Sequence, residues 1–284
     1  MPKRYGAPYT GSKNNIAETV IDFLPPGKRL CDLFGGGGAI SHCALTYGRN
    51  KYQSVLYNDI DTMVVEYVQK AFSGEFDIDE HEPEIITREQ FQERKNKDGD
   101  VAFLWSFGNN GIDYLWSKDK EEIKLAAFAM LTRESSGERY KYYKKFIRLL
   151  NNRNTDNKLE SLERIQALER MTYISDGRIQ FTNKSYSEYE HKDGDVVYCD
   201  IPYETAAGKV RYIKFNYEEF YEWADSRSYP VYFSSYEIND ERFYGYAIAK
   251  RRQLLSKTSN DSRMEMIYMN KAARAEKEQE MLLL

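Results

Sequence analysis

The chain has 284 residues, of which 41% are hydrophobic and 30% charged, and its formal net charge is −4. This length suits one large or two modest domains, and the apolar fraction is sufficient for a core. No apolar run reaches the ~20 residues that a membrane span requires, and Met1-Pro2-Lys3-Arg4 leads into no apolar signal region. We therefore expect a cytoplasmic protein that has no membrane partner.

Cysteine and histidine are sparse and scattered. Cys31, Cys43 and Cys199 form no C-x-x-C pair, which favours a reducing compartment without a disulfide framework. We expect no metal site and no Ser-His-Asp triad, because the histidines stand far apart in the sequence, at His42, His81 and His191.

The first predicted elements are a helix, a strand, a glycine loop and a second helix. Apolar positions between residues 16 and 24 predict a helix, which Pro25-Pro26-Gly27 ends. Leu30–Phe34 predicts a strand that runs into Gly35–Gly38, and a helix is expected from Ala39. At such a helix N-terminus the backbone approaches a ligand closely, so this loop predicts a nucleoside cofactor.

A second strand, Ser54–Tyr57, ends in Asn58-Asp59, and a helix is predicted over Asp61–Phe72. Asp59 follows Gly38 by about 20 residues, which is where an acid binds ribose hydroxyls in this kind of unit. The spacing therefore predicts that Asp59 contacts the cofactor.

A nicotinamide-dependent dehydrogenase is a competing interpretation of the glycine loop. Its fingerprint is G-x-G-x-x-G or A, and the third small position after Gly36 and Gly38 is Ser41 here. The match is partial, so the loop alone leaves the nucleoside cofactor open.

The middle of the chain, about 76 to 171, has no alternation of strand and helix. An apolar segment, Val101–Phe107, runs into Gly108-Asn109-Asn110-Gly111, and the acids between Glu75 and Glu84 suggest a solvated linker. We interpret this block as an inserted helical domain, with helices expected over Asp119–Leu131, Arg139–Leu150 and Lys158–Met171.

The stretch Arg139–Arg153 is basic and contains no acid, although the whole chain is acidic. A basic stripe of this kind can neutralise DNA phosphates locally, and an ordinary solvated helix face is the equal alternative. Tyrosine and phenylalanine are interleaved with its basic residues, which are Arg139, Lys141, Lys144, Lys145, Arg148 and Arg153.

The last third regains α/β character, with a helix predicted over Tyr217–Ala224 and a charged helical tail over Ala272–Leu284. The order of elements predicts an α/β fold with one Rossmann-like sheet, divided into 1–75, 76–171 and 172–284. The strands expected here are Ile179–Thr182, Asp195–Cys199, Val231–Ser235 and two runs around Lys250–Ser256 and Met264–Met269.

Asp200-Ile201-Pro202-Tyr203 follows a buried strand, and ligands of open α/β sheets bind outside the carboxyl ends of strands. Pro202 restricts Ile201 to an extended conformation, which leaves the Ile201 carbonyl able to act as an acceptor beside the Asp200 carboxylate. Two acceptors next to the face of Tyr203 suit a planar ring that carries an exocyclic amino group. The alternative is an Asx-type turn with a packing tyrosine.

Taken in order, these parts resemble the DNA adenine methylase family, the D12 class of N6-adenine-specific DNA methyltransferases. The resemblance runs from about Tyr9 to Asn270, and its specificity comes from the order of weak motifs. The motifs are Tyr9-x-Gly11-x-Lys13, Asp32-x-Phe34-x-Gly36-x-Gly38, Asn58-Asp59, Phe107-Gly108-Asn109-Asn110-Gly111, Asp200-Ile201-Pro202-Tyr203, and the late strands from Ser234-Ser235-Tyr236 to Asn270.

The resemblance implies S-adenosyl-L-methionine as cofactor and a flipped adenine as target, on a methyltransferase sheet with an inserted target-recognition domain. It implies that Lys13 contacts the cofactor's carboxylate with Tyr9 alongside, and that Asp59 holds the ribose hydroxyls. Asp32 would position the glycine loop or the amino group. The implied cofactor-binding residues are Tyr9, Gly11, Lys13, Asp32, Phe34, Gly36, Gly38, Asp59 and Asp200.

For the base, the resemblance implies that Asp200 and the Ile201 carbonyl accept the two N6 hydrogens, next to Pro202, while Tyr203 stacks on the ring. It implies double-stranded DNA as partner and a monomer, with a cognate restriction nuclease as an open question. The residues expected to contact DNA are Asn109, Asn110, Tyr114, Lys144 and Lys145.

The sequence departs from the family at two positions. Ile201 replaces the family's first proline, and Tyr114 stands where an arginine is common, so the family's common GATC target does not carry over. Two alternatives stay open: methylation of cytosine N4, and a non-catalytic relative that Ile201 has disarmed.

Overall fold

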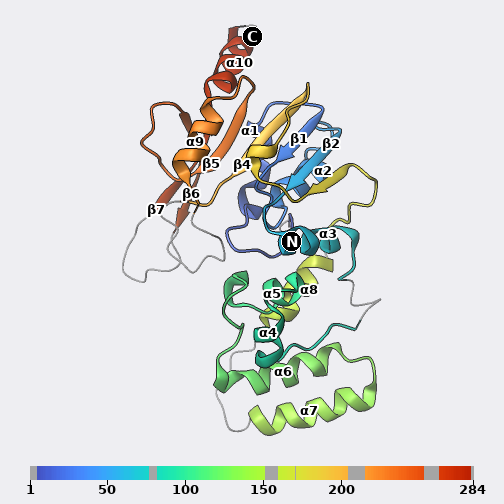
Figure 1. The fold of residues 1–284 in the computed structure, drawn as a ribbon. Helices are drawn as coiled ribbons and strands as arrows, with labels where there is room; N and C mark the ends of the chain where they lie inside the picture. Colours follow the sequence, from blue (N-terminus) through green and yellow to red (C-terminus); the bar gives the residue numbers. More distant parts are fainter. Residues whose placement is uncertain are drawn as a thin grey trace. The chain divides into compact units, whose positions relative to one another are not determined.

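The computed structural model describes residues 5–76, 82–150, 159–169, 171–203, 215–252 and 262–282. These residues form two compact units (Figure 1). The sheet unit comprises Lys13–Val65 and the described residues from Ile174 onward, and the helical unit comprises Glu66–Tyr173 together with the N-terminal segment up to Ser12.

Within the described residues, the sheet has seven strands in the order β3-β2-β1-β4-β5-β7-β6. The first five of these run parallel to one another, and β7 is antiparallel to both of its neighbours. The sheet is therefore Rossmann-like, with an antiparallel strand inserted where the dinucleotide order 3-2-1-4-5-6 has none. The strands are β1 (Arg29–Asp32), β2 (Ser54–Asn58), β3 (Ile179–Thr182), β4 (Asp195–Asp200), β5 (Val231–Ser235), β6 (Tyr244–Arg252) and β7 (Ser262–Met269).

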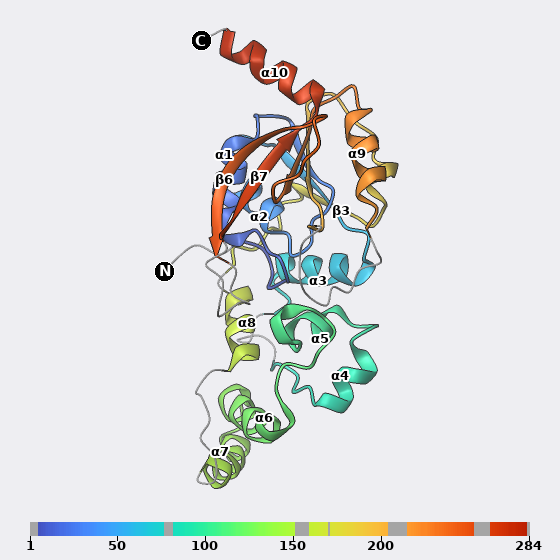
Figure 2. The ribbon, with the colours of Figure 1, turned by 90° about the vertical axis from the view of Figure 1, so that its left-hand side faces the viewer.

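The central strands are buried on both faces, which explains their continuous apolar sequences. Tyr232 and Phe233 of β5 point to opposite faces of the sheet. Phe23 of α1 packs on Tyr232, and Phe220 of α9 packs on Phe233, so these helices cover opposite faces (Figure 2). The helices of this unit are η1 (Asn14–Ile16), α1 (Ala17–Phe23), α2 (Ala39–Thr46), α9 (Tyr217–Asp225), α10 (Lys271–Leu282) and the start of α3 (Thr62–Ser73), and a further short turn is η3 (Tyr186–Glu188).

The prediction for the next-to-last strand began too late in the sequence. β6 begins at Tyr244 and ends at Arg252, whereas the sequence suggested a strand around Lys250–Ser256. Its first residues alternate small and aromatic side chains on an edge strand, which weakens the apolar signal. Residues 253–256 lie outside the described part of the chain, as does Arg153 of the basic stripe.

The helical unit has the character predicted for the middle of the chain, while its boundaries at 76 and 171 stay predictions. Among its described residues, the β-structure is confined to one isolated bridge, Ser106 to Tyr114. Helices α6 and α7 lie side by side as a hairpin (Figure 1). The remaining elements are α4 (Arg88–Arg94), α5 (Gly99–Leu104), η2 (Phe107–Asn109), α6 (Lys118–Thr132), α7 (Ser136–Leu150), α8 (Glu160–Glu169) and the end of α3.

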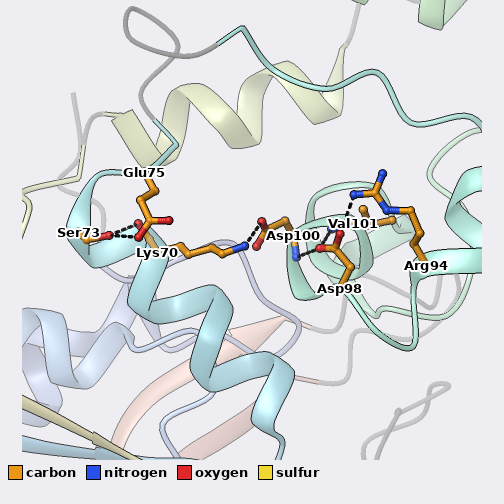
Figure 3. Close-up of polar contacts among 7 residues, drawn as sticks. All are labelled: Lys70, Ser73, Glu75, Arg94, Asp98, Asp100 and Val101. Carbon is orange, nitrogen blue, oxygen red and sulfur yellow. Dashed lines mark hydrogen bonds and ion pairs between the residues drawn. The ribbon is translucent and has the colours of Figure 1, made fainter.

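Short helices in this unit are held by side-chain caps and ion pairs (Figure 3). The Asp98 carboxylate accepts hydrogen bonds from the amides of Asp100 and Val101 and so caps α5. Asp98 also pairs with Arg94 at 2.7 Å, and Asp100 pairs with Lys70 of α3 at 2.7 Å. These contacts join α3, α4 and α5 into one unit. Across the described residues, no helix has both the length and the apolarity of a membrane span.

Candidate active site at the carboxyl edge of the sheet

Three carboxylates meet where neighbouring parallel strands end. Asp32 is the last residue of β1 and stands opposite Tyr57 of β2 and Tyr198 of β4. Asp59 and Asp200 come two residues after these partners. All three lie at the edge where ligands of open α/β sheets bind.

The glycine loop is fixed by bonds that the strand ends supply. The Gly36 amide donates to Asp59 Oδ2 at 2.9 Å, and the Tyr57 hydroxyl donates to the Gly36 carbonyl at 2.6 Å. Gly36 and Gly38 have left-handed φ angles of 47° and 72°, and Gly38 is the N-cap of α2. A Cβ at Gly35 would collide with the Tyr57 ring, so this position requires glycine.

Asp59 holds this loop. Its second oxygen accepts from the Asp61 amide at 2.9 Å, and its burial raises the pKa of the carboxyl to about 6. The predicted contact of Asp59 with ribose hydroxyls stays a prediction.

Asp32 has an unused acceptor. Its Oδ2 accepts from the Ser41 hydroxyl at 2.7 Å, whereas no donor among the described residues reaches its buried Oδ1. Burial raises the pKa of Asp32 to about 7. A buried acceptor of this kind suits a ligand that brings its own ammonium group, so the residues present fit the amino-acid end of the expected cofactor.

The Asp200 carboxylate is held through one of its two oxygens. Lys13 Nζ lies 2.6 Å from Oδ1, and the Ser234 hydroxyl donates to the same oxygen at 2.9 Å. The Tyr198 hydroxyl in turn donates to Ser234 at 2.8 Å. In the described part of the chain no donor reaches Oδ2, which is left to accept a hydrogen bond from outside. Burial raises the pKa of Asp200, and Lys13 opposes that rise.

Glu265 of β7 is a site residue that the sequence analysis missed. It is buried, lies 3.4 Å from Lys13 Nζ and accepts a hydrogen bond from the Tyr203 hydroxyl. The Tyr203 ring lies 4.6 Å from Lys13 Nζ and packs edge-on against Tyr236. The signal in the sequence was a single acid inside an apolar strand, Met264–Met269.

Ile201 does more than supply a carbonyl. Its side chain is 1% exposed and belongs to the apolar core under the site. The side chain therefore contributes to packing under the site, while the role of the carbonyl as an acceptor stays a prediction. The core around it also contains Leu33, Cys199, Phe220, Phe233 and Tyr268.

Phe34 lies beside the glycine loop, with its ring stacked on Tyr186 at a centroid distance of 5.3 Å. Tyr9 and Gly11 belong to the helical unit, where the Tyr9 ring packs on Phe103 at 5.2 Å. Their predicted contacts with the cofactor stay predictions.

In the predicted DNA-contacting loop, the side-chain amides of the two asparagines form hydrogen bonds with the protein's own backbone. Asn109 Nδ2 donates to the Phe103 carbonyl at 2.7 Å, and Asn110 Oδ1 accepts from the amides of residues 112 and 113. Tyr114 is buried, and its hydroxyl donates to the Ile86 carbonyl at 2.8 Å. The exposed side chain of this loop is Phe107.

A cavity of about 930 Å³ lies beside this loop, within the helical unit. More of its charged lining residues are basic than acidic, and two of these cations are engaged within the protein, Arg88 with Glu121 at 2.8 Å and Lys95 with the Ile112 carbonyl at 2.8 Å. The lining includes Arg88, Lys95, Lys120, Lys124, Asp113, Tyr114, Trp116 and Glu160.

The lysines predicted to meet phosphates lie on α7, a helix without a buried residue. Lys144 Nζ lies 4.5 Å from the centroid of the exposed Tyr140 ring. Lys145 pairs with Glu122 of α6 at 3.3 Å. One of the two lysines is therefore already partly neutralised within the protein.

The family model of the D12 class N6 adenine-specific DNA methyltransferases matches residues 9–234. The chain belongs to this family. The match covers the motifs from Tyr9 to Ser234, so the resemblance seen in the sequence is confirmed and the dehydrogenase interpretation of the glycine loop is overturned.

A curated relative is the DNA N-6-adenine-methyltransferase of Escherichia phage P1, which is 24% identical over 223 residues. The match covers 75% of this chain and 26% of the relative, so the chain spans about a quarter of that protein. Two structures of the rRNA methyltransferase AviRa from Streptomyces viridochromogenes were also matched, at 13% identity over 93% of this chain and 86% of theirs, with TM-scores of 0.35 and 0.36.

The family model shows membership in the adenine methyltransferase family, and the strand order is that of a Rossmann-like sheet. Glu265 and β7 lie beyond the matched range. The contacts of Glu265 with Lys13 and Tyr203 are therefore a finding of the structure.

Proposed function

We propose that the chain transfers a methyl group from S-adenosyl-L-methionine to N6 of adenine in double-stranded DNA, with the target base flipped out of the duplex. The observation that carries this proposal is the Asp200 carboxylate, which Lys13 and Ser234 hold through one oxygen and whose other oxygen has no donor among the described residues. Family membership supports adenine as the target.

In this proposal the chemistry is positioning and electrostatics. The adenine N6 lone pair is delocalised into its ring, and acceptors on the N6 hydrogens favour a nucleophilic amine. Asp200 Oδ2 and the Ile201 carbonyl would accept these hydrogens, and Tyr203 would stack on the base. The cofactor supplies an electrophilic methyl group, and Asp200 takes the proton that N6 loses.

Lys13 has a second role in this scheme. Its ammonium lies against Asp200 and Glu265, so we propose that it keeps Asp200 ionised until the proton is transferred. Its contact with the cofactor's carboxylate stays a prediction. Asp32 Oδ1 would accept from the cofactor's ammonium, while Asp59 and the left-handed glycines Gly36 and Gly38 shape the loop that holds its nucleoside.

The test is methyl transfer to DNA by the full chain. We expect label from the cofactor's methyl group to enter duplex DNA and to be recovered as N6-methyladenine after digestion. Recovery as N4-methylcytosine would replace the proposal with the cytosine alternative. An absence of label on every DNA tested, with the protein folded, would support the non-catalytic alternative.

Replacing Ile201 by proline tests whether this residue disarms the site. We expect the methyl-transfer rate to change by less than about tenfold, because Pro202 already restrains residue 201. We also expect a lower stability, by roughly 1–3 kcal/mol, because the buried Ile201 side chain leaves the core. Urea unfolding and methylation rates measure the two effects, and a variant that switches on an otherwise inert protein would contradict the first.

We propose that the helical unit recognises the target DNA, with Lys144 and Lys145 on the phosphates. Changing both lysines to glutamine should weaken binding to all duplexes about equally and reduce the salt slope by roughly 2. The measurement is a titration of duplex DNA at several salt concentrations. The matched control changes Lys28 and Lys192 of the sheet unit, and an equal loss in the control would argue for a general charge effect.

A further inference from the structure

Glu265 is a buried carboxylate that reaches the site from β7, beyond the range of the family model. Strand β7 runs antiparallel to β5, so its first residues lie where β5 ends, at the edge of the sheet that carries the site. Side chains alternate along a strand, and Glu265 shares a face of the sheet with the buried Ile267. A carboxylate that is 0% exposed is costly unless its contacts compensate for the lost water.

The neighbouring edge strand is irregular opposite this residue. Met266 pairs with Ala247 and Glu265 pairs with Ala249, so β6 has one extra residue at this point. Bulges of this kind are frequent next to active sites, where they redirect a side chain. The bulge therefore marks Glu265 as a position at which the sheet departs from a regular ladder.

Two site residues contact the same oxygen of Glu265, and their distances rank them. The Tyr203 hydroxyl donates a hydrogen bond to Oε1, whereas Lys13 Nζ lies 3.4 Å from this atom and 2.6 Å from Asp200 Oδ1. A separation of 3.4 Å exceeds that of a normal hydrogen bond, so Lys13 is primarily the partner of Asp200 and supplies Glu265 with a nearby positive charge. Glu265 therefore acts mainly on Tyr203.

The Tyr203 ring is fixed by three contacts. Glu265 binds its hydroxyl, Lys13 Nζ lies 4.6 Å from the ring centroid, and the Tyr236 ring packs edge-on at a centroid distance of 4.6 Å. Burial raises the pKa of Tyr203 well above its ordinary value, so the phenol keeps the hydrogen that it donates. Stacking on a base needs a fixed ring plane, and the bond to Glu265 holds the hydroxyl end of the ring.

We propose that Glu265 is a positioning residue for methyl transfer, which holds the Tyr203 ring in the plane that stacks on the target base. This inference rests on the proposed function. Stacking alone requires no hydroxyl, since a phenylalanine ring has a similar face, so the bond to Glu265 gives the Tyr203 hydroxyl its role. Because Glu265 acts through this hydroxyl, its contribution disappears when the hydroxyl is absent.

The experiment compares variants of the full chain by single-turnover methyl transfer to duplex DNA. Glu265→Leu removes the acceptor and should slow the transfer by about 10- to 100-fold. Glu265→Gln retains an acceptor oxygen for the Tyr203 hydroxyl and should slow it by less than about fivefold. Tyr203→Phe should slow the transfer as much as Glu265→Leu does, and the double variant Glu265→Leu, Tyr203→Phe should be no slower than either.

A second measurement follows the base itself. The site is first located by mapping N6-methyladenine in DNA that the unchanged protein has methylated, and 2-aminopurine then replaces the target adenine in a duplex. Its fluorescence changes when the base leaves the helical stack. Glu265→Leu and Tyr203→Phe should alter this signal alike, and Glu265→Gln should retain it. The matched control, Glu222→Leu, changes an exposed glutamate of α9 and should retain both the rate and the signal.

A Glu265→Leu variant that methylates DNA as fast as the unchanged protein would overturn the inference and leave the proposed function intact. So would multiplied losses in the double variant, because Glu265 would then act on a group other than Tyr203. If Glu265→Leu does not fold, Tyr203→Phe decides, since full activity without the hydroxyl would leave Glu265 nothing to act through. An unchanged protein that methylates no DNA would overturn the proposed function and the inference with it.

Discussion

Replacing Asp200 by alanine is expected to abolish methyl transfer while the protein stays folded and binds DNA. The change removes the acceptor for the N6 hydrogen and the group that takes the proton. Loss of one preorganised polar partner of a reacting group typically costs about 100- to 1,000-fold in rate, and Asp200 supplies two functions, so we expect the upper end or beyond. Labelled methyl transfer to duplex DNA under single-turnover conditions measures the loss.

Two controls make this result specific. Asp193→Ala removes an exposed carboxylate at the other end of β4 and should retain the rate. Circular dichroism and DNA titration of the Asp200 variant should match those of the unchanged protein. A variant that retained a tenth or more of the rate would show that Asp200 is not the acceptor.

Replacing Lys13 by methionine is expected to be the most destabilising change near the site. Lys13 is 4% exposed and bridges Asp200 and Glu265, so its loss leaves buried carboxylates close together. Removing one partner of a buried ion pair typically costs about 3–5 kcal/mol in the free energy of unfolding. Urea unfolding at neutral pH measures the loss.

The loss should depend on pH. Without Lys13 the pKa of Asp200 rises further above its unfolded value, so the penalty is present when Asp200 is ionised and fades as pH falls and the folded protein binds a proton. The deficit relative to the unchanged protein should therefore be smaller at about pH 5 than at about pH 8. The double variant Lys13→Met, Asp200→Asn should recover part of the stability, and equal deficits at both pH values would argue for lost packing instead.

Much of the sheet was predictable because its strands are buried. β3 and β5 have the bounds that the sequence predicted, since short apolar runs bounded by turns are typical of parallel strands. The glycine loop and the Asp200 tetrapeptide could be recognised in the sequence. Each is a short contiguous motif whose residue types suit one local backbone geometry. The start of β6 was missed, because an edge strand needs no continuous apolar run.

The partners of Asp200 were not predictable in the same way. Lys13, Ser234 and Glu265 reach the site from separate parts of the chain, and only the strand order β4-β5-β7 brings the latter two beside Asp200. For Asn109 and Asn110 the residue type was evident from the sequence, but the contacts of their side chains were not. Their residue type suits base contacts, but a turn with left-handed Gly108 and Asn109 uses both amides for its own bonds.

The hydrogen bonds that run from Tyr198 through Ser234 to Asp200 all have the same direction, because each hydroxyl donates to the next group. Burial raises the pKa of Tyr198 well above its ordinary value, so this phenol stays protonated and donates to Ser234, which then donates to Asp200 Oδ1. With Lys13 donating to the same atom, Oδ1 has no room for a proton of its own. The two oxygens of this carboxyl group are therefore inequivalent, and whenever the group is protonated the hydrogen resides on Oδ2. Protonation of Asp200 thus turns the one open acceptor into a donor, which would repel an incoming donor group.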